Sequence, residues 1–163
     1  MMGKSHLLIG LGVGLVLATA LHSDPLHIAA MTVAAGAGAM LPDIDHRHAP
    51  IRQKLGLLGD VLLFWLPHRG LTHSLLVLAI VTGLAVFFWQ TFGIALAAGY
   101  ASHLIADMTT QHGLPILYPW EANFYVLPRG FRVTTGKLSE GFALLLILGS
   151  MGLMFARLSG FIH

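Results

Sequence analysis

Histidine and aspartate residues fall in short clusters whose composition suits a metal site. His103 and Asp107 are four residues apart, a spacing that puts two side chains on the same face of a helix. Ligand pairs at this spacing bind zinc in metalloproteases. The alternative is a hydrogen bond between the two side chains that packs neighbouring helices, and this pair alone favours neither interpretation.

A second cluster, Asp43-Ile44-Asp45-His46, follows a proline in a polar stretch. Its two carboxylates and one imidazole combine oxygen and nitrogen ligands, a mixture that suits zinc, manganese or iron. The alternative is a helix cap followed by solvated turn charges.

The densest cluster is His68-Arg69-Gly70-Leu71-Thr72-His73-Ser74. Its glycine permits a tight turn, the arginine matches the geometry of a phosphate or carboxylate, and Thr72 or Ser74 can cap the next helix. We interpret His68 and His73 as metal ligands or proton-transfer groups rather than as part of an ordinary interfacial loop. His6 stands alone, and convergence with the other clusters makes it a candidate.

The composition indicates a membrane protein. The 163 residues are 56% apolar and 10% charged, with a mean hydropathy of +0.78, whereas soluble domains have about 25% charged residues. The absence of cysteine excludes disulfides, thiolate ligands and thiol nucleophiles. A net charge of +2 is too small to indicate nucleic-acid binding.

The apolar runs predict an all-α, polytopic bundle of about five spans in a single domain, residues 1–163. The expected spans are residues 7–21, 26–41, about 74–89, about 93–108 and 141 to about 156, with a break in the long run 71–105 near Gln90. Residues 55–67 are too few to cross a bilayer and are expected to be interfacial or re-entrant. Residues 109–140 are expected to form a loop.

The first apolar run also resembles a secretory signal peptide, with Ala18-Thr19-Ala20 as a cleavage site. We expect a retained helix instead, because His6 at its start belongs with the later clusters.

Five crossings would place the N-terminus and residues 42–73 and 109–140 on one face of the membrane. Of the nine Lys and Arg residues, only Arg157 falls on the other face, so the positive-inside rule predicts that the first face is cytoplasmic. The three clusters and His6 lie on that same face. His22, His27 and His163 fall on the opposite face and are excluded, whereas His48 and His112 remain possible rim residues.

These residues outnumber the ligands of one ion, and carboxylates can bridge two ions in hydrolytic sites. Ser74 and Ser102 lack the setting of a nucleophile, which disfavours a serine hydrolase. The predicted metal ligands are His6, Asp43, His46, His68, His73, His103 and Asp107. The predicted catalytic residues are Asp45, His73 and Arg69, although the sequence does not identify which aspartate is the general base.

The clusters resemble the signature blocks of the YdjM family, bacterial and archaeal inner-membrane proteins described as metal-dependent hydrolases. The resemblance is carried by His6-Leu7-Leu8, by Leu41-Pro42-Asp43-Ile44-Asp45-His46, and by the segments 68–76 and 99–107, and it continues at Gly113-Leu114-Pro115 and Tyr118-Pro119-Trp120. It implies that the predicted ligands, together with Asp45, are the family's polar positions. The family is distantly similar to zinc-dependent phospholipase C, whose His-x-x-x-Asp ligand pairs resemble His103 and Asp107.

The resulting expectation is a metal-dependent hydrolase in a prokaryotic inner membrane, a phosphoesterase or phospholipase-like enzyme acting on a lipid or phosphorylated substrate at the cytoplasmic leaflet. Two or three divalent ions are expected, zinc first, with manganese or iron possible. The loop aromatics would lie at the membrane interface, and Arg69, Arg129 and Arg132 would hold a phosphate. The alternative is a non-catalytic sensor or scaffold. A transporter is disfavoured, because transporter sites lie near the bilayer midplane. The oligomeric state and the roles of Asp60 and Glu121 stay open.

Overall fold

The structure is a computed structural model that describes residues 1–21, 24–45 and 70–161. Regular structure within these ranges is helical, without strands, which confirms the predicted all-α bundle. The helices are α1 (Gly3–Ala20), α2 (Pro25–Met40), α4 (Leu75–Met108) and α5 (Leu138–Leu158), with 3-10 turns η1 (Pro42–Asp45), η2 (Leu71–His73) and η3 (Arg129–Phe131). The predicted interfacial segment 55–67 lies outside the described residues.

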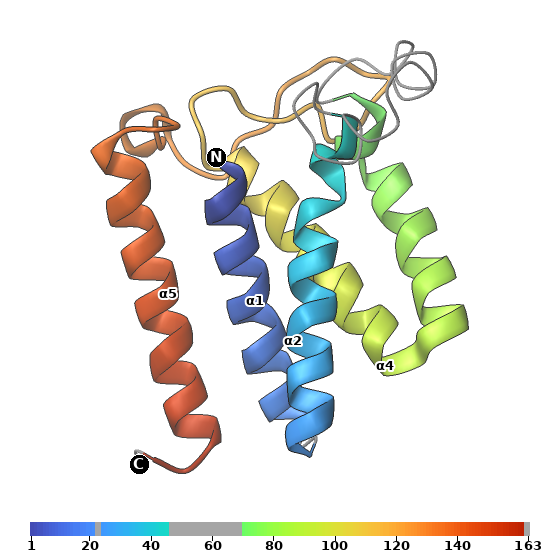
Figure 1. Ribbon diagram of the computed structural model, residues 1–163. Helices are drawn as coiled ribbons and strands as arrows, with labels where there is room; N and C mark the ends of the chain where they lie inside the picture. The colour runs from blue at the N-terminus through green and yellow to red at the C-terminus, as the bar shows by residue number, and fades with distance from the viewer. Residues whose placement is uncertain (22–23, 46–69, 162–163) are drawn as a thin grey trace.

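The long helix α4 is two helical segments joined at Gln90. This residue has φ 43° and ψ −108°, an unusual conformation for a residue with a side chain, and the chain reverses direction there (Figure 1). The break expected near Gln90 is therefore confirmed. The second segment begins directly after Gln90 instead of at residue 93. Gly93 lets the two segments approach closely, because a Cβ there would lie 2.1 Å from the Ala85 carbonyl oxygen.

Three helices, α1, α4 and α5, are long and apolar enough to cross a membrane, and α2 is a shorter apolar helix. With α4 divided at Gln90, the described chain contains the five helical segments that the apolar runs predict. The helices begin before those runs: α1 starts at Gly3 instead of residue 7, and α5 at Leu138 instead of residue 141. The apolar run marks the part that meets hydrocarbon, and polar flanking residues add a further turn.

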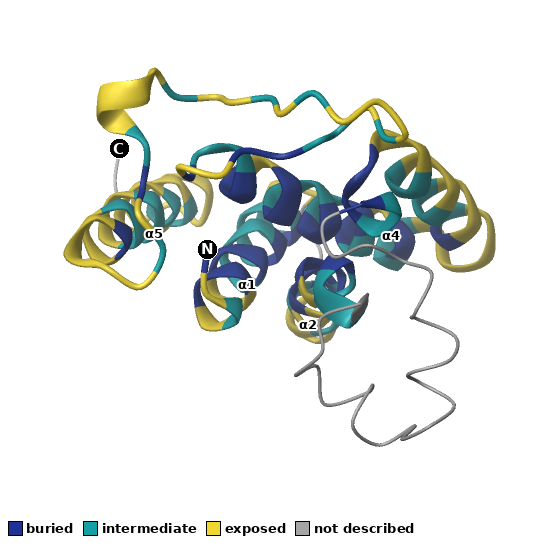
Figure 2. Cartoon of the chain, turned by 90° about the horizontal axis from the view of Figure 1, so that it is seen from above, coloured by how far each residue is buried: buried dark blue, intermediate teal, exposed yellow. Residues whose placement is uncertain are grey.

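Helix α1 lies at the centre of the arrangement, between α5 and α2, and the second segment of α4 crosses behind α1 and α2 (Figure 1). Burial is concentrated where α1, α2 and α4 meet, whereas α5 is largely exposed (Figure 2). Its exposed residues include Phe142 and Leu145, which are 66% and 72% accessible. A helix with such an apolar outer face suits contact with lipid.

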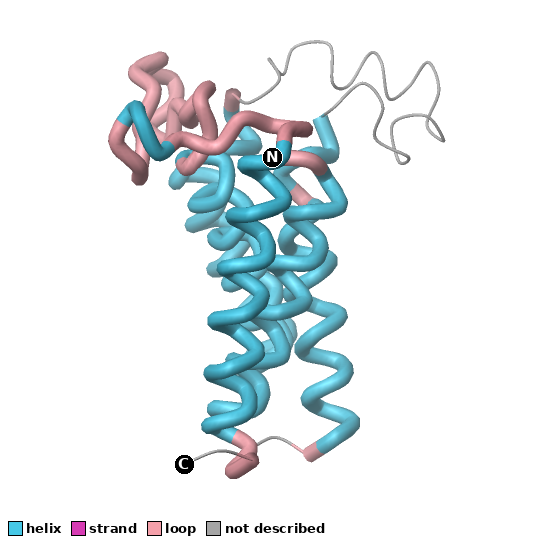
Figure 3. The backbone as a smooth tube through the Cα atoms, turned by 90° about the vertical axis from the view of Figure 1, so that its left-hand side faces the viewer, coloured by secondary structure: helices cyan, strands magenta, loops and turns pink. Residues whose placement is uncertain are grey.

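One end of the bundle carries most of the polar loops (Figure 3). The start of α1, the end of α2, both ends of α4 and the start of α5 meet there (Figure 1), as five consecutive antiparallel helical segments require. We call this the site end. The loop 109–137 crosses it and is held by backbone hydrogen bonds, from Val133 N to Thr109 O (2.9 Å) and from Phe124 N to Leu114 O (2.9 Å).

Candidate metal centre

His103 and Asp107 lie on the second segment of α4 and face the same buried space. The Nε2 of His103 is 3.9 Å from the Asp107 Oδ2, so their four-residue spacing does place both side chains on one face. The Nδ1 of His103 lies 2.7 Å from the Ala39 carbonyl oxygen on α2. Because a carbonyl only accepts, Nδ1 carries the hydrogen, and the Nε2 of the neutral ring presents a lone pair.

Asp43 enters the site from the turn that ends α2. Pro42 lacks an N–H for the helical ladder, and the chain tightens into η1 with a hydrogen bond from Ile44 N to Leu41 O. The Asp43 Oδ1 lies 3.7 Å from the Nε2 of both His73 and His103. Burial raises the pKa of the Asp43 carboxyl, but the interactions with His73, His103 and His6 lower it by more, so that the pKa falls to about 2. Asp43 is therefore ionised at neutral pH.

His73 is positioned by η2, directly before α4. The following residue, Ser74, caps α4 by accepting a hydrogen bond from Val77 N (3.3 Å), which confirms one of the two predicted caps. The Nε2 of His73 lies 3.3 Å from the Nε2 of His103. Behind the ring, the Thr72 hydroxyl is 3.1 Å from Nδ1, and the Tyr100 hydroxyl donates to the Thr72 carbonyl.

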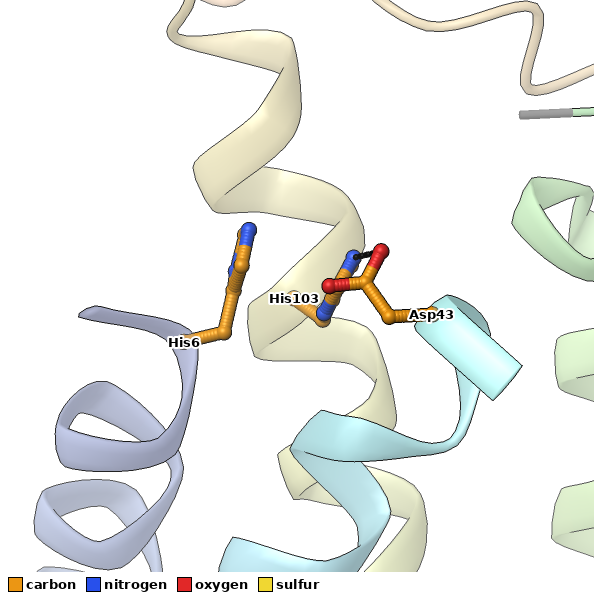
Figure 4. A group of neighbouring side chains, drawn as sticks. All are labelled: His6, Asp43 and His103. Atoms are coloured by element: carbon orange, nitrogen blue, oxygen red, sulfur yellow. Dashed lines mark ion pairs between the residues drawn. The ribbon is translucent and has the colours of Figure 1, made fainter. Parts of the chain in front are cut away.

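His6 reaches the site from the first turn of α1 (Figure 4). Its ring stacks on that of His103, with centroids 3.6 Å apart and planes 16° apart. Its Nε2 is 3.2 Å from the Asp107 Oδ1, which the Met1 amino nitrogen also approaches to 2.5 Å. The His6 Nδ1 is buried and has no hydrogen-bond partner among the described residues.

Two imidazole nitrogens lie close to each other and to two carboxylate oxygens. The two Nε2 atoms of His73 and His103 are 3.3 Å apart, and each lies 3.7 Å from Asp43 Oδ1 and 3.9 Å from Asp107 Oδ2. Two nitrogens bound to one tetrahedral zinc at about 2.0–2.1 Å would be about 3.3–3.4 Å apart. Unless a proton or a cation lies between them, the two ring nitrogens and the two carboxylates repel one another, and the mixed nitrogen and oxygen donor set fits a divalent metal ion.

The structure brings together residues from all three clusters and the lone His6. The predicted ligands His6, Asp43, His73, His103 and Asp107 all belong to the two groups whose donor atoms lie within 4.8 Å of one another. His46, His68 and Arg69 lie outside the described residues, as does the side chain of Asp45, and their roles stay predictions. His112 and Glu121 are exposed in the loop, and His27 bonds Asp24 at the other end of α2.

Three groups around the site were missed in the sequence: the Ala39 carbonyl, Tyr100 and Glu140, which accepts hydrogen bonds from Met2 N and the Ser5 hydroxyl beside His6. A backbone carbonyl has no sequence signal. Tyr100 lies within the segment 99–107 that carries the family resemblance, but nothing in its spacing predicts a hydrogen bond to Thr72. Glu140 did carry a signal, because an ionisable residue at the start of an apolar helix is expensive to retain without a role.

We expect Tyr100→Phe to weaken the support of His73. The substitution leaves the Thr72 carbonyl without the Tyr100 hydroxyl donor, and changing a group that orients a ligand typically lowers metal affinity about 10–100-fold. Competition for zinc against a chelator measures this. Tyr125→Phe, at a tyrosine 38% exposed in the loop, is the matched control and should bind zinc like the wild type; equal affinity in both variants would contradict the expectation.

Comparison with known proteins identifies the family. The model of the family described as YdjM inner membrane protein matches residues 1–161. The chain belongs to the YdjM family. The resemblance carried by the sequence blocks is thereby confirmed, and the chain is an inner-membrane protein.

Individual relatives agree with this assignment. A Bacillus subtilis protein described as uncharacterized, YvsG, is 34% identical over 121 residues, which cover 73% of this chain and 74% of that protein. The inner membrane protein YdjM of Escherichia coli is 38% identical over 94 residues, or 52% of this chain and 47% of the relative, and that of Shigella flexneri matches equally. The match thus spans about half the length of the Escherichia coli and Shigella flexneri relatives. No solved structure matches the chain.

Proposed function

We propose that this YdjM-family protein is a metal-dependent hydrolase embedded in the membrane. The observation that carries the proposal is the arrangement of two imidazole nitrogens 3.3 Å apart, both within 3.9 Å of two carboxylate oxygens. A divalent ion bound by these donors would supply a Lewis acid and a water of lowered pKa, which is the chemistry of metal-dependent hydrolysis. The absence of cysteine and the mixed nitrogen and oxygen donors favour zinc, with manganese or iron as the next candidates.

The burial of the donor side chains favours a site that is open on one side. The side chains of His73, His103 and Asp107 are at most 2% accessible, whereas that of Asp43 is 25% accessible. Catalytic metal sites keep a position for water or substrate, whereas structural sites are closed. A substrate would therefore approach the site from the side on which Asp43 lies. His103 and His73 are each held from behind, so the protein fixes the two imidazoles before substrate arrives.

A phosphoester or phospholipid is the substrate class that fits the surroundings best. The site lies at helix ends, where a lipid headgroup would lie, and the loop 109–137 crosses the same end. That loop exposes Trp120 and Phe131 at 66% and 77%, as expected for side chains in the interfacial layer. It also carries Arg129 and Arg132, and guanidinium groups recognise phosphate. The predicted role of Arg69 in holding phosphate is retained in the proposal.

The proposal places the site end in the cytoplasm. Lys4, Arg129, Arg132 and Lys137 belong to this end of the bundle, whereas Arg157 lies in the last turn of α5 at the other end. Positive charge near helix ends favours the cytoplasmic side. A substrate lipid would then come from the inner leaflet.

Hydrolysis by purified protein in vesicles tests the function. We expect zinc-dependent release of headgroup or phosphate from a panel of phospholipids and phosphoesters, with the rate of His73→Ala reduced at least about 100-fold. The control is His27→Ala, which removes an exposed histidine at the opposite end and should leave the rate unchanged. Turnover that persists in His73→Ala, or a wild type that binds zinc and hydrolyses nothing in the panel, would contradict the proposal; the second result would favour a sensor or scaffold.

A further inference from the structure

Glu140 is a buried acidic residue that the proposed chemistry does not use. It lies in the first turn of α5 and is 1% exposed. Its Oε1 accepts hydrogen bonds from Met2 N and from the Ser5 hydroxyl, both at 2.7 Å, and its Oε2 accepts one from Gly136 N at 2.7 Å. One carboxylate therefore joins the start of α5, the end of the loop 109–137 and the first turn of α1.

The first turn of α1 is also the part of the chain that delivers His6. Ser5 and Met2 bind Glu140, while the next residue, His6, contacts Asp107 and stacks on His103. The ends of α1 and α5 lie side by side at the site end (Figure 1). Rotation or fraying of this turn would move the His6 ring away from both partners.

We propose that Glu140 is a positioning residue of the metal centre, which fixes the first turn of α1 so that His6 meets Asp107 and His103. The inference rests on the proposed function in one respect, that the cluster holds a metal ion. Charge-assisted hydrogen bonds of this kind are stronger than neutral ones, and three of them leave the carboxylate fixed. Groups that orient the residues of a metal site are worth about 10–100-fold in metal affinity.

The variant Glu140→Gln tests the inference with little change in shape. An amide NH₂ replaces one acceptor oxygen, so it must face either Gly136 N–H or the donors on α1. We expect zinc affinity to fall about 10–100-fold and the visible spectrum of the cobalt-substituted protein to change. Glu121→Gln makes the same chemical change at an exposed loop position and should leave both measurements as in the wild type.

An engineered disulfide can distinguish two roles of Glu140, the positioning of His6 and the simple anchoring of α5 to α1. A Cβ on Gly12 would lie 3.9 Å from the Met151 Cβ, within the range of about 3.5–4.5 Å that a disulfide requires, and the chain has no other cysteine. Gly12→Cys with Met151→Cys thus locks α5 to α1 without Glu140. In this locked background, we expect Glu140→Gln still to weaken zinc binding. Recovery of wild-type affinity on locking would overturn the inference and reduce Glu140 to a helix anchor.

A second readout needs no metal. In chelator-treated locked protein, the buried His6 should react slowly with diethyl pyrocarbonate, and Glu140→Gln should expose it, as mass spectrometry of the labelled histidine would show. Unchanged protection of His6 would also overturn the inference. If instead the wild type bound no zinc, the proposed function would fail, while the labelling would still decide whether Glu140 holds His6 in place.

Discussion

Asp107→Asn is expected to abolish stoichiometric metal binding while leaving the protein folded. Asp107 contacts three histidines: its Oδ1 lies 3.2 Å from His6, and its Oδ2 lies 3.9 Å from both His73 and His103. The substitution keeps the shape of the side chain but removes its charge. Loss of a direct ligand should exceed the roughly 10–100-fold that removal of an orienting group causes, so we expect a weakening of more than about 100-fold.

Thermal unfolding in detergent, with and without zinc, measures this effect. A ligand at 100 times its Kd stabilises the folded state by about 2.7 kcal/mol, so the wild type should show a clear rise in Tm on addition of zinc. Asp107→Asn should show none at the same concentration. The control is Asp24→Asn, because Asp24 also contacts a histidine but lies exposed at the other end of the bundle. A zinc-dependent rise in Asp107→Asn as large as in wild type would remove Asp107 from the metal centre.

Among glycine-to-alanine substitutions near the site, Gly99→Ala is expected to lower the stability of the protein most. A Cβ at Gly99 would lie 1.9 Å from the Ala35 carbonyl oxygen, so α4 and α2 would have to separate. Small residues allow this close approach of membrane helices. Gly99 lies one turn before His103 on α4. The Nδ1 of His103 bonds the carbonyl of Ala39, which lies on α2 like Ala35. We expect destabilisation of about 1–3 kcal/mol or more together with weakened zinc binding.

Gly83→Ala provides the matched control on the same helix. A Cβ at Gly83 meets no atom within 4 Å, and alanine is the better helix former. Its stability should equal or exceed that of the wild type, and its zinc affinity should be unchanged. Equal stability of the two variants would mean that α2 and α4 do not pack as closely as the structure shows.

Much of the architecture was predictable because hydropathy and charge act over whole segments. The break near Gln90, the gathering of the clusters at one end and the shared face of His103 and Asp107 all follow from run lengths, crossing order and helical spacing. Helix ends were less predictable: α1 and α5 extend beyond their apolar runs, because the bilayer constrains only the part of a helix within it.

The supporting interactions of the site were beyond the sequence because they depend on close contact between distant segments. Ala39 contributes a backbone oxygen, which any residue would supply, and only the approach of α2 to α4 brings it to His103. Glu140 joins residues more than a hundred positions away. His6 was a weak candidate as a lone histidine, and only the structure shows that its ring stacks on that of His103.

The most direct test of the account is the coordination of metal in the purified wild-type protein. Metal content per chain, combined with X-ray absorption at the zinc edge, would show whether an ion lies between His73 and His103. We predict at least one zinc per chain, bound by at least two imidazoles and by carboxylate oxygens at about 2.0–2.2 Å. Folded protein that holds no stoichiometric metal after purification with zinc would contradict the account, and the cluster would then be a polar network that packs the helix ends.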